Sequence, residues 1–381
     1  MEVAVRHPTR RSARPPAADA ARRRTGGPPS HVALLASASH PIARPYAGGL
    51  EALTHRLATE LRRRGHEVTL YASGDSDPAL GVTPILPRSA RLQLTEAAKA
   101  DPSMVAEPFL AEHHAYLQAM LDLAGSDVDL VHNHSLHYLP IAMAPTLSCP
   151  LLTTLHTPPT PWLESAMATL PPGAGASFVS VSAANAQAWT ATPVHGVVHN
   201  GIPTDEWPFV ATPDDHLVWM GRLVPEKAPH LAIEAARLPG LPLLLAGPVG
   251  DADYVAGEIT PRLGGAIRHV GHLDTDALAQ LVGRARACLV TPDWEEPYGL
   301  VVTEALSCGT PVLGFARGAL PELVDDTCGR LVAARDVAGL AAATADIDAI
   351  DRSACRERAL TIGSLEAMTD RYEQLYAELV G

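Results

Sequence analysis

One stretch of the sequence, residues 288–324, constrains the fold more than any other. It reads CLVTPDWEEPYGLVVTEALSCGTPVLGFARGALPELV. Its first apolar run, residues 288–290, is short and is followed by the helix-breaking Pro292 and Pro297. This pattern is typical of a buried strand of a parallel sheet that opens into a loop.

A helix is predicted to follow that loop, over residues 300–307, because its apolar residues have helical spacing. Gly299 stands at its start, Gly309 at its end, and Pro311 prevents its continuation. A second apolar run at 312–313 then completes a strand–helix–strand unit. In α/β folds such a unit places the loop and the helix N-terminus at the carboxyl end of the sheet, where ligands bind.

The start of this helix is also a predicted anion site. The free amide groups of Gly299, Leu300 and Val301, with the helix dipole, favour a phosphate there. Glu296 lies in the loop before the helix, and Glu304 lies just over one turn inside it. One carboxylate could meet the reacting part of a ligand while the other meets a part farther back. Spacing alone leaves open an ordinary exposed helix with two solvated glutamates.

The whole pattern resembles the E-x7-E signature of the retaining glycosyltransferases of family four. Seven residues separate Glu296 from Glu304, and the sequences ALSCGTPV and GALPELV follow. The resemblance implies an α/β chain with the GT-B fold, in which two doubly wound, Rossmann-like domains face each other across a cleft. It also implies that Glu304 binds the ribose hydroxyls of a sugar nucleotide and that Glu296 lies beside the donor sugar.

Composition limits the class of protein. A chain of 381 residues is long enough for about two domains. The formal net charge of −13 argues against a nucleic-acid-binding protein. Five scattered cysteines, none in C-x-x-C spacing, indicate reduced thiols, and no apolar run is long enough to span a bilayer. We therefore expect a cytoplasmic protein.

Four segments are predicted along the chain. Residues 1–30 are rich in arginine and proline and should form a disordered tail. Its arginines could touch an anionic membrane surface, but a solvated tail is the interpretation we favour. Residues 31–200 should form the acceptor-side domain and residues 201–360 the nucleotide-sugar-binding domain. Residues 361–381 have amphipathic helical spacing, and the resemblance implies a helix that returns to the first domain; a coiled-coil partner is the alternative.

The first domain should begin with another strand–helix–strand unit. Its loop ends at the glycine pair that includes Gly49, which would let a ligand approach the helix N-terminus closely. The pair is not the G-x-G-x-x-G dinucleotide fingerprint. The resemblance implies that the glycine backbone faces the donor.

Three histidines follow predicted strands of this domain. His132 and His134 have metal-ligand spacing, but no third ligand accompanies them, and we favour hydrogen-bonded loop histidines. Whether these two contact the acceptor is open. His156 matches a family histidine near the donor sugar and the acceptor.

Two cations share one predicted strand-to-helix loop of the second domain, Arg222 and Lys227. The resemblance implies that both meet the donor diphosphate, which suits a bidentate guanidinium and a point-charge ammonium. Surface cations in a loop are the alternative. The D-x-D matches at 127–129 and 251–253 lack the context of a metal site, so no metal is expected.

The resulting prediction is a retaining, hexosyltransferase-like enzyme that needs neither metal nor cofactor. It would move a sugar from a nucleoside-diphosphate sugar to an acceptor, which could be a sugar, a lipid or a small molecule. The acceptor, the base and sugar of the donor, and the oligomeric state are not predicted. A sugar-nucleotide epimerase or a phosphorylase of the same fold, and a non-catalytic nucleotide-sugar-binding protein, remain as alternatives.

Overall fold

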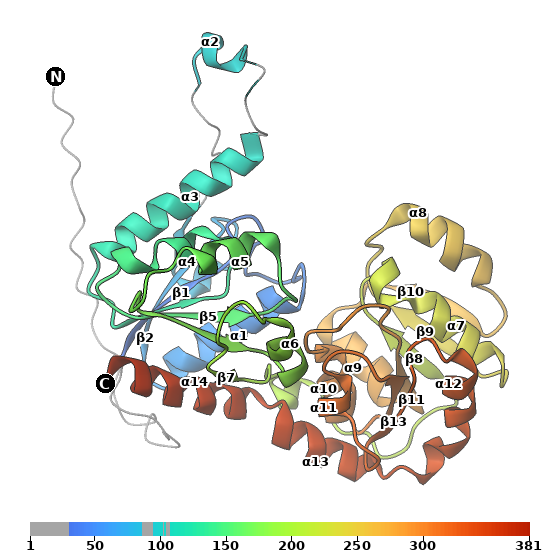
Figure 1. The fold of residues 1–381 in the computed structure, drawn as a ribbon. Helices are drawn as coiled ribbons and strands as arrows, with labels where there is room; N and C mark the ends of the chain where they lie inside the picture. The colour runs from blue at the N-terminus through green and yellow to red at the C-terminus, as the bar shows by residue number, and fades with distance from the viewer. Residues whose placement is uncertain (1–29, 86–93, 102, 104–106) are drawn as a thin grey trace, which may run out of the picture.

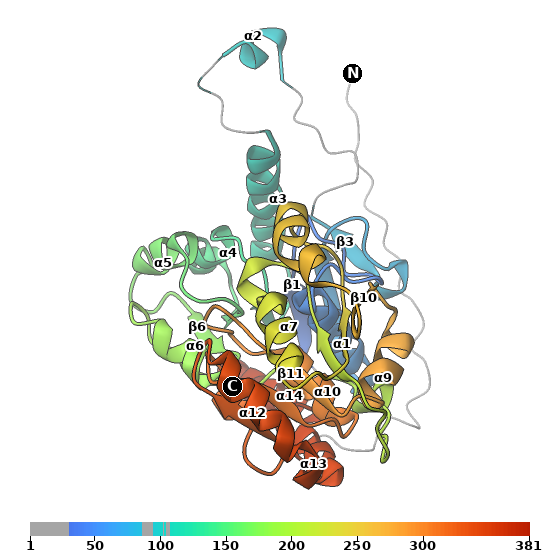
Figure 2. The ribbon, with the colours of Figure 1, turned by 90° about the vertical axis from the view of Figure 1, so that its right-hand side faces the viewer.

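The computed structural model describes residues 30–85, 94–101, 103 and 107–381. The predicted N-terminal tail, apart from Ser30, lies outside the described residues. The described chain forms two parallel sheets with helices on both faces of each (Figures 1 and 2), so the predicted doubly wound α/β architecture is confirmed. Among the described helices, none has the length and apolar character needed to cross a membrane.

The first sheet has seven parallel strands in the order β3-β2-β1-β4-β5-β6-β7. Its strands are β1 (His31–Leu35), β2 (Glu67–Ala72), β3 (Val82–Pro84), β4 (Leu130–Asn133), β5 (Leu151–Leu155), β6 (Ala176–Ser180) and β7 (Gly196–Val197). The helices of this half are α1 (Gly49–Arg63), α2 (Glu96–Lys99), α3 (Glu107–Ala124), α4 (Leu139–Ala142), α5 (Pro161–Ala168) and α6 (Ala183–Ala188).

The second sheet has six parallel strands in the order β10-β9-β8-β11-β12-β13. They are β8 (Leu217–Met220), β9 (Leu243–Ala246), β10 (Ile267–Gly271), β11 (Ala287–Val290), β12 (Val312–Phe315) and β13 (Gly329–Val332). The helices of this half are α7 (Pro229–Arg237), α8 (Ala252–Tyr254), α9 (Thr275–Gly283), α10 (Leu300–Ser307), α11 (Leu320–Leu323), α12 (Val337–Ala343) and α13 (Arg352–Ile362).

The predicted strand–helix–strand unit forms β11, α10 and β12. The two strands pair in parallel with Cys288 opposite Val312, and all their residues are buried. This burial explains why both strands appear as continuous apolar runs. Gly309, with φ of 78°, adopts the left-handed conformation that ends α10. The loop between β11 and α10 is thus held at the carboxyl edge of the sheet.

The C-terminal helix α14 (Leu365–Val380) leaves the second half and packs under the first sheet (Figure 1). Its apolar face, including Met368, Tyr372 and Tyr376, joins the core that contains Leu57 and Leu61 of α1. The C-terminal helix α14 therefore packs in the same domain as the first strand, β1.

A buried ion cluster joins α14 to the end of α1. The Arg64 guanidinium donates to Glu60 at 2.7 Å, to Glu373 at 2.8 Å and to Asp370. His66 also pairs with Glu373, at 2.9 Å. Burial alone would lower the pKa of Arg64, but the hydrogen bonds to the three carboxylates outweigh it and raise the pKa. Arg64 is therefore the shared cation that neutralises this buried acidic cluster.

We predict that Arg64→Ala lowers the free energy of unfolding by about 3–5 kcal/mol, because Glu60 and Glu373 would remain buried without their cation. Arg63→Ala is the matched control. Arg63 pairs with the same Glu60, but its side chain is 60% exposed, so the loss should stay below about 1 kcal/mol. Urea denaturation followed by circular dichroism measures both. Equal losses in the two variants would contradict the role assigned to Arg64.

Candidate functional site

Helix α10 begins without a side-chain cap. Its N-cap is Gly299, whose φ of 99° lies in the left-handed region, and no side chain of the described residues caps the first turn. The amide groups of Leu300 and Val301 therefore point out of the helix start as donors. Together with the helix dipole they favour a negative charge at this point.

A cation, a carboxylate and an indole meet beside this helix start. The Lys227 ammonium pairs with the Glu296 carboxylate, and the Trp294 indole donates to the same carboxylate oxygen at 3.1 Å. The ammonium also lies 5.2 Å from the centre of the Trp294 ring, within range of a cation–π contact. Trp294 was not among the predicted site residues, although an aromatic residue directly before two glutamates is a visible signal.

The loop that carries Glu296 is fixed by close backbone packing. A Cβ on Gly318 would lie 2.2 Å from the Glu296 carbonyl oxygen, so only glycine fits there. The amide of Ala319 donates to the same carbonyl at 2.9 Å. Asp293, at the start of the loop, accepts from Arg317 at 2.8 Å. These contacts hold the loop without any help from a ligand.

Arg222 lies just after strand β8, at a point where the backbones of Gly221 and Gly247 are in close contact. A Cβ on Gly247 would lie 1.8 Å from the carbonyl oxygen of Gly221, so the two backbones touch. The Arg222 guanidinium lies 3.7 Å from Glu226, and its side chain is 53% exposed. Such a long, exposed pair holds the guanidinium only weakly, and an incoming anion can replace Glu226.

Glu304 is a carboxylate without a partner. It is partly exposed, and within the described chain no donor binds its oxygens. Burial raises its pKa to about 7; the guanidinium of Arg56 opposes this shift, and Glu206 adds to it. Arg56 comes from α1 of the first domain and pairs with Glu206 at 3.1 Å. Both oxygens of Glu304 are thus available to a pair of hydroxyl donors.

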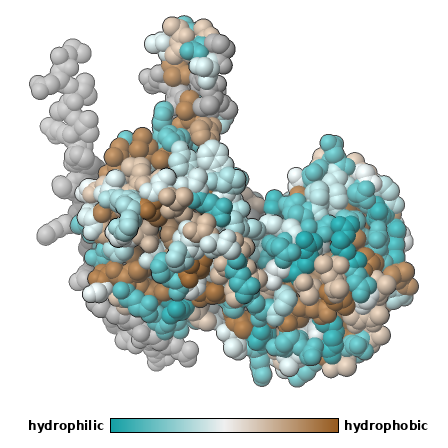
Figure 3. Space-filling model, in the orientation of Figure 1, coloured by the Kyte–Doolittle hydropathy of each residue, from teal (hydrophilic) through white to brown (hydrophobic). Residues whose placement is uncertain are grey.

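The two domains meet where Gly49 faces α10. A Cβ on Gly49 would lie 2.7 Å from Cδ1 of Leu300. The N-terminal ends of α1 and α10 therefore come together, and both dipoles favour an anion near this point. Figure 3 shows the hollow between the two lobes, with hydrophilic residues gathered beside it on the second lobe.

His156 follows β5 in the first domain and belongs to a buried chain of hydrogen bonds. Its Nε2 lies 2.9 Å from Nδ1 of His134, whose Nε2 lies 3.3 Å from Nδ1 of His132. His132 in turn contacts Thr154 at 2.8 Å and Tyr376 of α14 at 2.7 Å. Burial lowers the pKa of His156 to about 3, so its imidazole is neutral near pH 7.

The histidines and aspartates whose spacing resembles that of metal ligands are hydrogen-bonded within the protein. His132 and His134 are both hydrogen-bonded, but only His134 lies in the loop, because His132 belongs to strand β4. The described residues contain no group of three or more His, Cys, Asp or Glu that could hold a metal. Asp251 caps α8 by accepting from the Tyr254 amide at 2.9 Å. Asp129 accepts from the backbone amide of His31 at 2.7 Å. These aspartates therefore serve the fold.

Of the predicted site residues, the structure brings together Lys227 with Glu296 and Gly49 with Leu300. The hydrogen bond of His156 is to His134, within the first domain. The arrangement assembles cations, helix starts and carboxylates around one end of the second sheet.

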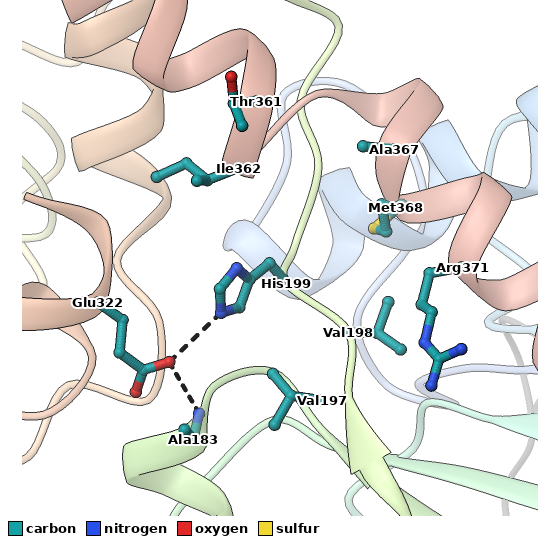
Figure 4. A pocket seen from close by; sticks show the side chains of 10 residues that line it. All are labelled: Ala183, Val197, Val198, His199, Glu322, Thr361, Ile362, Ala367, Met368 and Arg371. Atoms are coloured by element: carbon teal, nitrogen blue, oxygen red, sulfur yellow. Dashed lines mark hydrogen bonds and ion pairs between the residues drawn. The ribbon is translucent and has the colours of Figure 1, made fainter.

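A further contact between the domains lies behind this site. The Glu322 carboxylate accepts from the amides of Ala183 and Ala184, at 2.9 and 2.6 Å, and lies 3.3 Å from His199 (Figure 4). Glu322 was not among the predicted site residues, because no local sequence pattern marks a residue that caps a helix of another domain. A cavity of about 490 Å³ opens beside it, and none of the predicted site residues lines this cavity.

Comparison with known proteins matches both halves of the chain. The family model described as Glycosyltransferase Family 4 matches residues 47–206, and the one described as Glycosyl transferases group 1 matches residues 207–359. A glycogen synthase of Mycobacterium tuberculosis is 32% identical over 353 residues, which cover 82% of this chain and 84% of the relative. A D-inositol 3-phosphate glycosyltransferase of Mycolicibacterium smegmatis is 28% identical over 354 residues, covering 81% of each.

Solved structures share the fold. A sucrose-phosphate synthase from Thermosynechococcus elongatus matches with a TM-score of 0.70 and 20% identity, covering 92% of this chain and 99% of that one. A glycosyltransferase involved in avilamycin A biosynthesis matches with a TM-score of 0.68 and 23% identity, covering 92% and 98%. An Anabaena protein in complex with UDP and glucose matches with a TM-score of 0.66 and 18% identity, covering 90% and 98%. The chain thus belongs to glycosyltransferase family four and is a glycosyltransferase with the GT-B fold.

Proposed function

We propose that this glycosyltransferase moves a sugar from a nucleoside-diphosphate sugar to an acceptor with retention of the anomeric configuration and without a metal. The observation that carries the proposal is the Lys227–Glu296 pair at the uncapped start of α10. It puts a cation, a helix dipole and a carboxylate within one small region. The cation and the helix dipole stabilise a diphosphate, and the carboxylate stabilises a sugar that develops positive charge.

The donor's diphosphate is assigned to the space between the starts of α1 and α10. Lys227 already lies beside α10, and Arg222 can leave its long contact with Glu226 to add a second cation. Charge-assisted hydrogen bonds of this kind are shorter and stronger than neutral ones. Two cations and two helix starts offset the charge of the leaving group, which is the task that a metal performs in other transferases.

The ribose of the donor is assigned to Glu304. Its carboxylate lies one turn along α10 from the phosphate position and has no partner among the described residues. Two neighbouring ribose hydroxyls are donors that match its two oxygens. Burial raises the pKa of Glu304 to about 7, and hydrogen bonds from two ribose hydroxyls would favour its ionised form.

The transfer step then follows from these positions. The bond between the anomeric carbon and the diphosphate oxygen breaks, and its electron pair stays with the diphosphate. The acceptor oxygen bonds to the same carbon on the same face, and its proton passes to the departing phosphate oxygen. Glu296 stabilises the positive charge on the sugar, while the neutral His156 binds a sugar or acceptor hydroxyl.

The acceptor differs between the relatives of this chain. One relative is named for glycogen and another for D-inositol 3-phosphate, and either kind of acceptor is compatible with the donor chemistry above. The acceptor belongs on the first domain, because the residues proposed for the donor lie mainly on the second.

We predict that binding of a nucleoside diphosphate strengthens as pH rises from 6 to 8. Glu304 must be ionised to accept from both ribose hydroxyls, and with a free pKa of about 7 the affinity at pH 6 should be about tenfold lower than at pH 8. Calorimetric titration at each pH measures the change. Glu304→Gln should bind more weakly and lose this pH dependence, whereas ionisation of the ligand itself would affect both proteins equally. A parallel pH profile in the variant would contradict the ribose assignment.

We also predict that an α-linked donor gives an α-linked product in the presence of a chelator, because the cations and helix starts replace a metal. Proton NMR of the first product formed measures the anomeric configuration directly. Glu296→Gln should reduce turnover more than donor affinity. A β-linked product, or activity that chelation abolishes and magnesium restores, would overturn the mechanism.

A further inference from the structure

The acceptor side of the molecule has an unusual distribution of charge. No lysine or arginine occurs between Lys99 and Arg222. This stretch supplies the loops that follow β4, β5 and β6, at the carboxyl edge of the first sheet. Ligands of doubly wound sheets bind at this edge, and His156 lies there. An acceptor held by these loops therefore meets no cationic side chain from them.

The same edge carries a group of aromatic rings, here called the aromatic shelf: Phe109, His113, His137, Tyr138 and Trp162. The Trp162 ring lies 5.6 Å from Phe109 and 5.5 Å from Tyr138, and it is nearly parallel to Tyr138, at 23°. Tyr138 stacks in turn on His137 at 4.8 Å and 21°. The rings thus form a continuous surface.

Two rings of the aromatic shelf are open to solvent. Trp162 is 52% exposed and Phe109 is 37% exposed, which is a high exposure for large aromatic side chains. Exposed aromatic surface with polar groups around it marks a binding site more often than a structural one. The polar groups here are the His113 imidazole and the Tyr138 hydroxyl, which hold each other at 2.9 Å.

The chain order places the aromatic shelf next to the reaction site. Trp162 follows His156 within one loop and the start of α5, and His137 follows His134 in the loop after β4. Helix α3 leads into β4 from the opposite direction, so its first turns, with Phe109 and His113, lie at the same edge. The aromatic shelf and the hydrogen-bonded pair His134–His156 therefore lie on segments that leave the same edge of the first sheet.

We propose that the aromatic shelf binds the acceptor and that this acceptor is an uncharged saccharide chain. The proposal rests on the function proposed above and names its acceptor class. Aromatic faces bind the apolar C–H faces of pyranose rings, and the imidazole and phenol groups at their edges bind hydroxyls.

Charge disfavours the main competitor, a phosphorylated acceptor, at the aromatic shelf. Arg44, in the loop that follows β1 at the same edge of the sheet, is paired with Glu206 at 2.9 Å. A phosphorylated acceptor needs arginine or lysine partners, because a phosphate taken from water without them is strongly unfavourable. The helices of the aromatic shelf instead carry acids, Glu112 on α3 and Glu164 on α5, which repel an anion.

The test measures saccharide binding in the absence of donor. Maltohexaose and cellohexaose are titrated into the full-length protein by calorimetry and by tryptophan fluorescence. Trp162 is the reporter of the aromatic shelf, because Trp189, Trp207 and Trp219 are buried and the half-buried Trp294 lies in the proposed donor site; the change that is lost in Trp162→Phe is the part assigned to the shelf. One of the two oligosaccharides should bind, and Trp162→Ala should weaken it about tenfold. Trp162→Phe keeps a ring, so it should retain affinity within about twofold while losing the fluorescence change.

Two controls separate this proposal from others. Leu121→Ala removes an equally exposed apolar side chain, 53% open, from the far half of α3 and should leave saccharide affinity unchanged. Nucleoside diphosphate affinity should be unchanged in Trp162→Ala, which shows that the variant is folded and keeps its donor site. Because no transfer is measured, an enzyme that fails the stereochemical test can still pass this one.

Three results would overturn the proposal. The first is equal oligosaccharide affinity in Trp162→Ala and the parent protein. The second is tighter binding of glucose 6-phosphate than of either oligosaccharide. The third is the absence of oligosaccharide binding at millimolar concentration, in which case the exposed rings serve another ligand.

Discussion

The ion pair between Lys227 and Glu296 is the contact on which the site depends. The two residues come from loops that follow different strands, β8 and β11, and these strands are neighbours in the second sheet. In the absence of ligand each charge neutralises the other. In the proposed function a donor phosphate would compete for the ammonium, and this competition would free the carboxylate to face the sugar. The same cation can thereby stabilise the resting site and the leaving group.

The surrounding structure fixes the positions of the loops that carry both charged groups. The Trp294 indole fixes one oxygen of Glu296, and the missing side chain of Gly318 lets another loop press against its backbone. Across the cleft, Gly49 allows α1 to approach α10, and Glu322 bonds to amide groups of the first domain. The α14 helix completes the connection through the buried Arg64 cluster. The two domains are therefore joined through Gly49 and Leu300, through Glu322, and through the chain that leads into α14.

The sequence predicts the local parts of this structure well and the long-range contacts poorly. Helix α10 and its flanking strands follow from apolar runs, glycines and prolines, because burial and backbone geometry are local properties. The pairing of Lys227 with Glu296 joins residues far apart in the chain, so spacing alone could not reveal it. The role of Glu322 was missed for the same reason, whereas Trp294, two residues from Glu296, has a local signal that was overlooked. The aromatic shelf is also invisible in the sequence, since its rings come from three separate segments.

Calorimetric titration of nucleoside diphosphate and of nucleoside into Lys227→Ala tests most sharply whether the ammonium binds the donor phosphates. Diphosphate affinity should fall at least about tenfold while nucleoside affinity is unchanged, because the phosphates are the only part of the ligand assigned to the ammonium. Arg222→Ala should behave in the same way. Arg237→Ala, which removes an exposed cation at the other end of α7, should have no effect. Equal losses for nucleoside and diphosphate in Lys227→Ala would show that Lys227 does not bind the diphosphate.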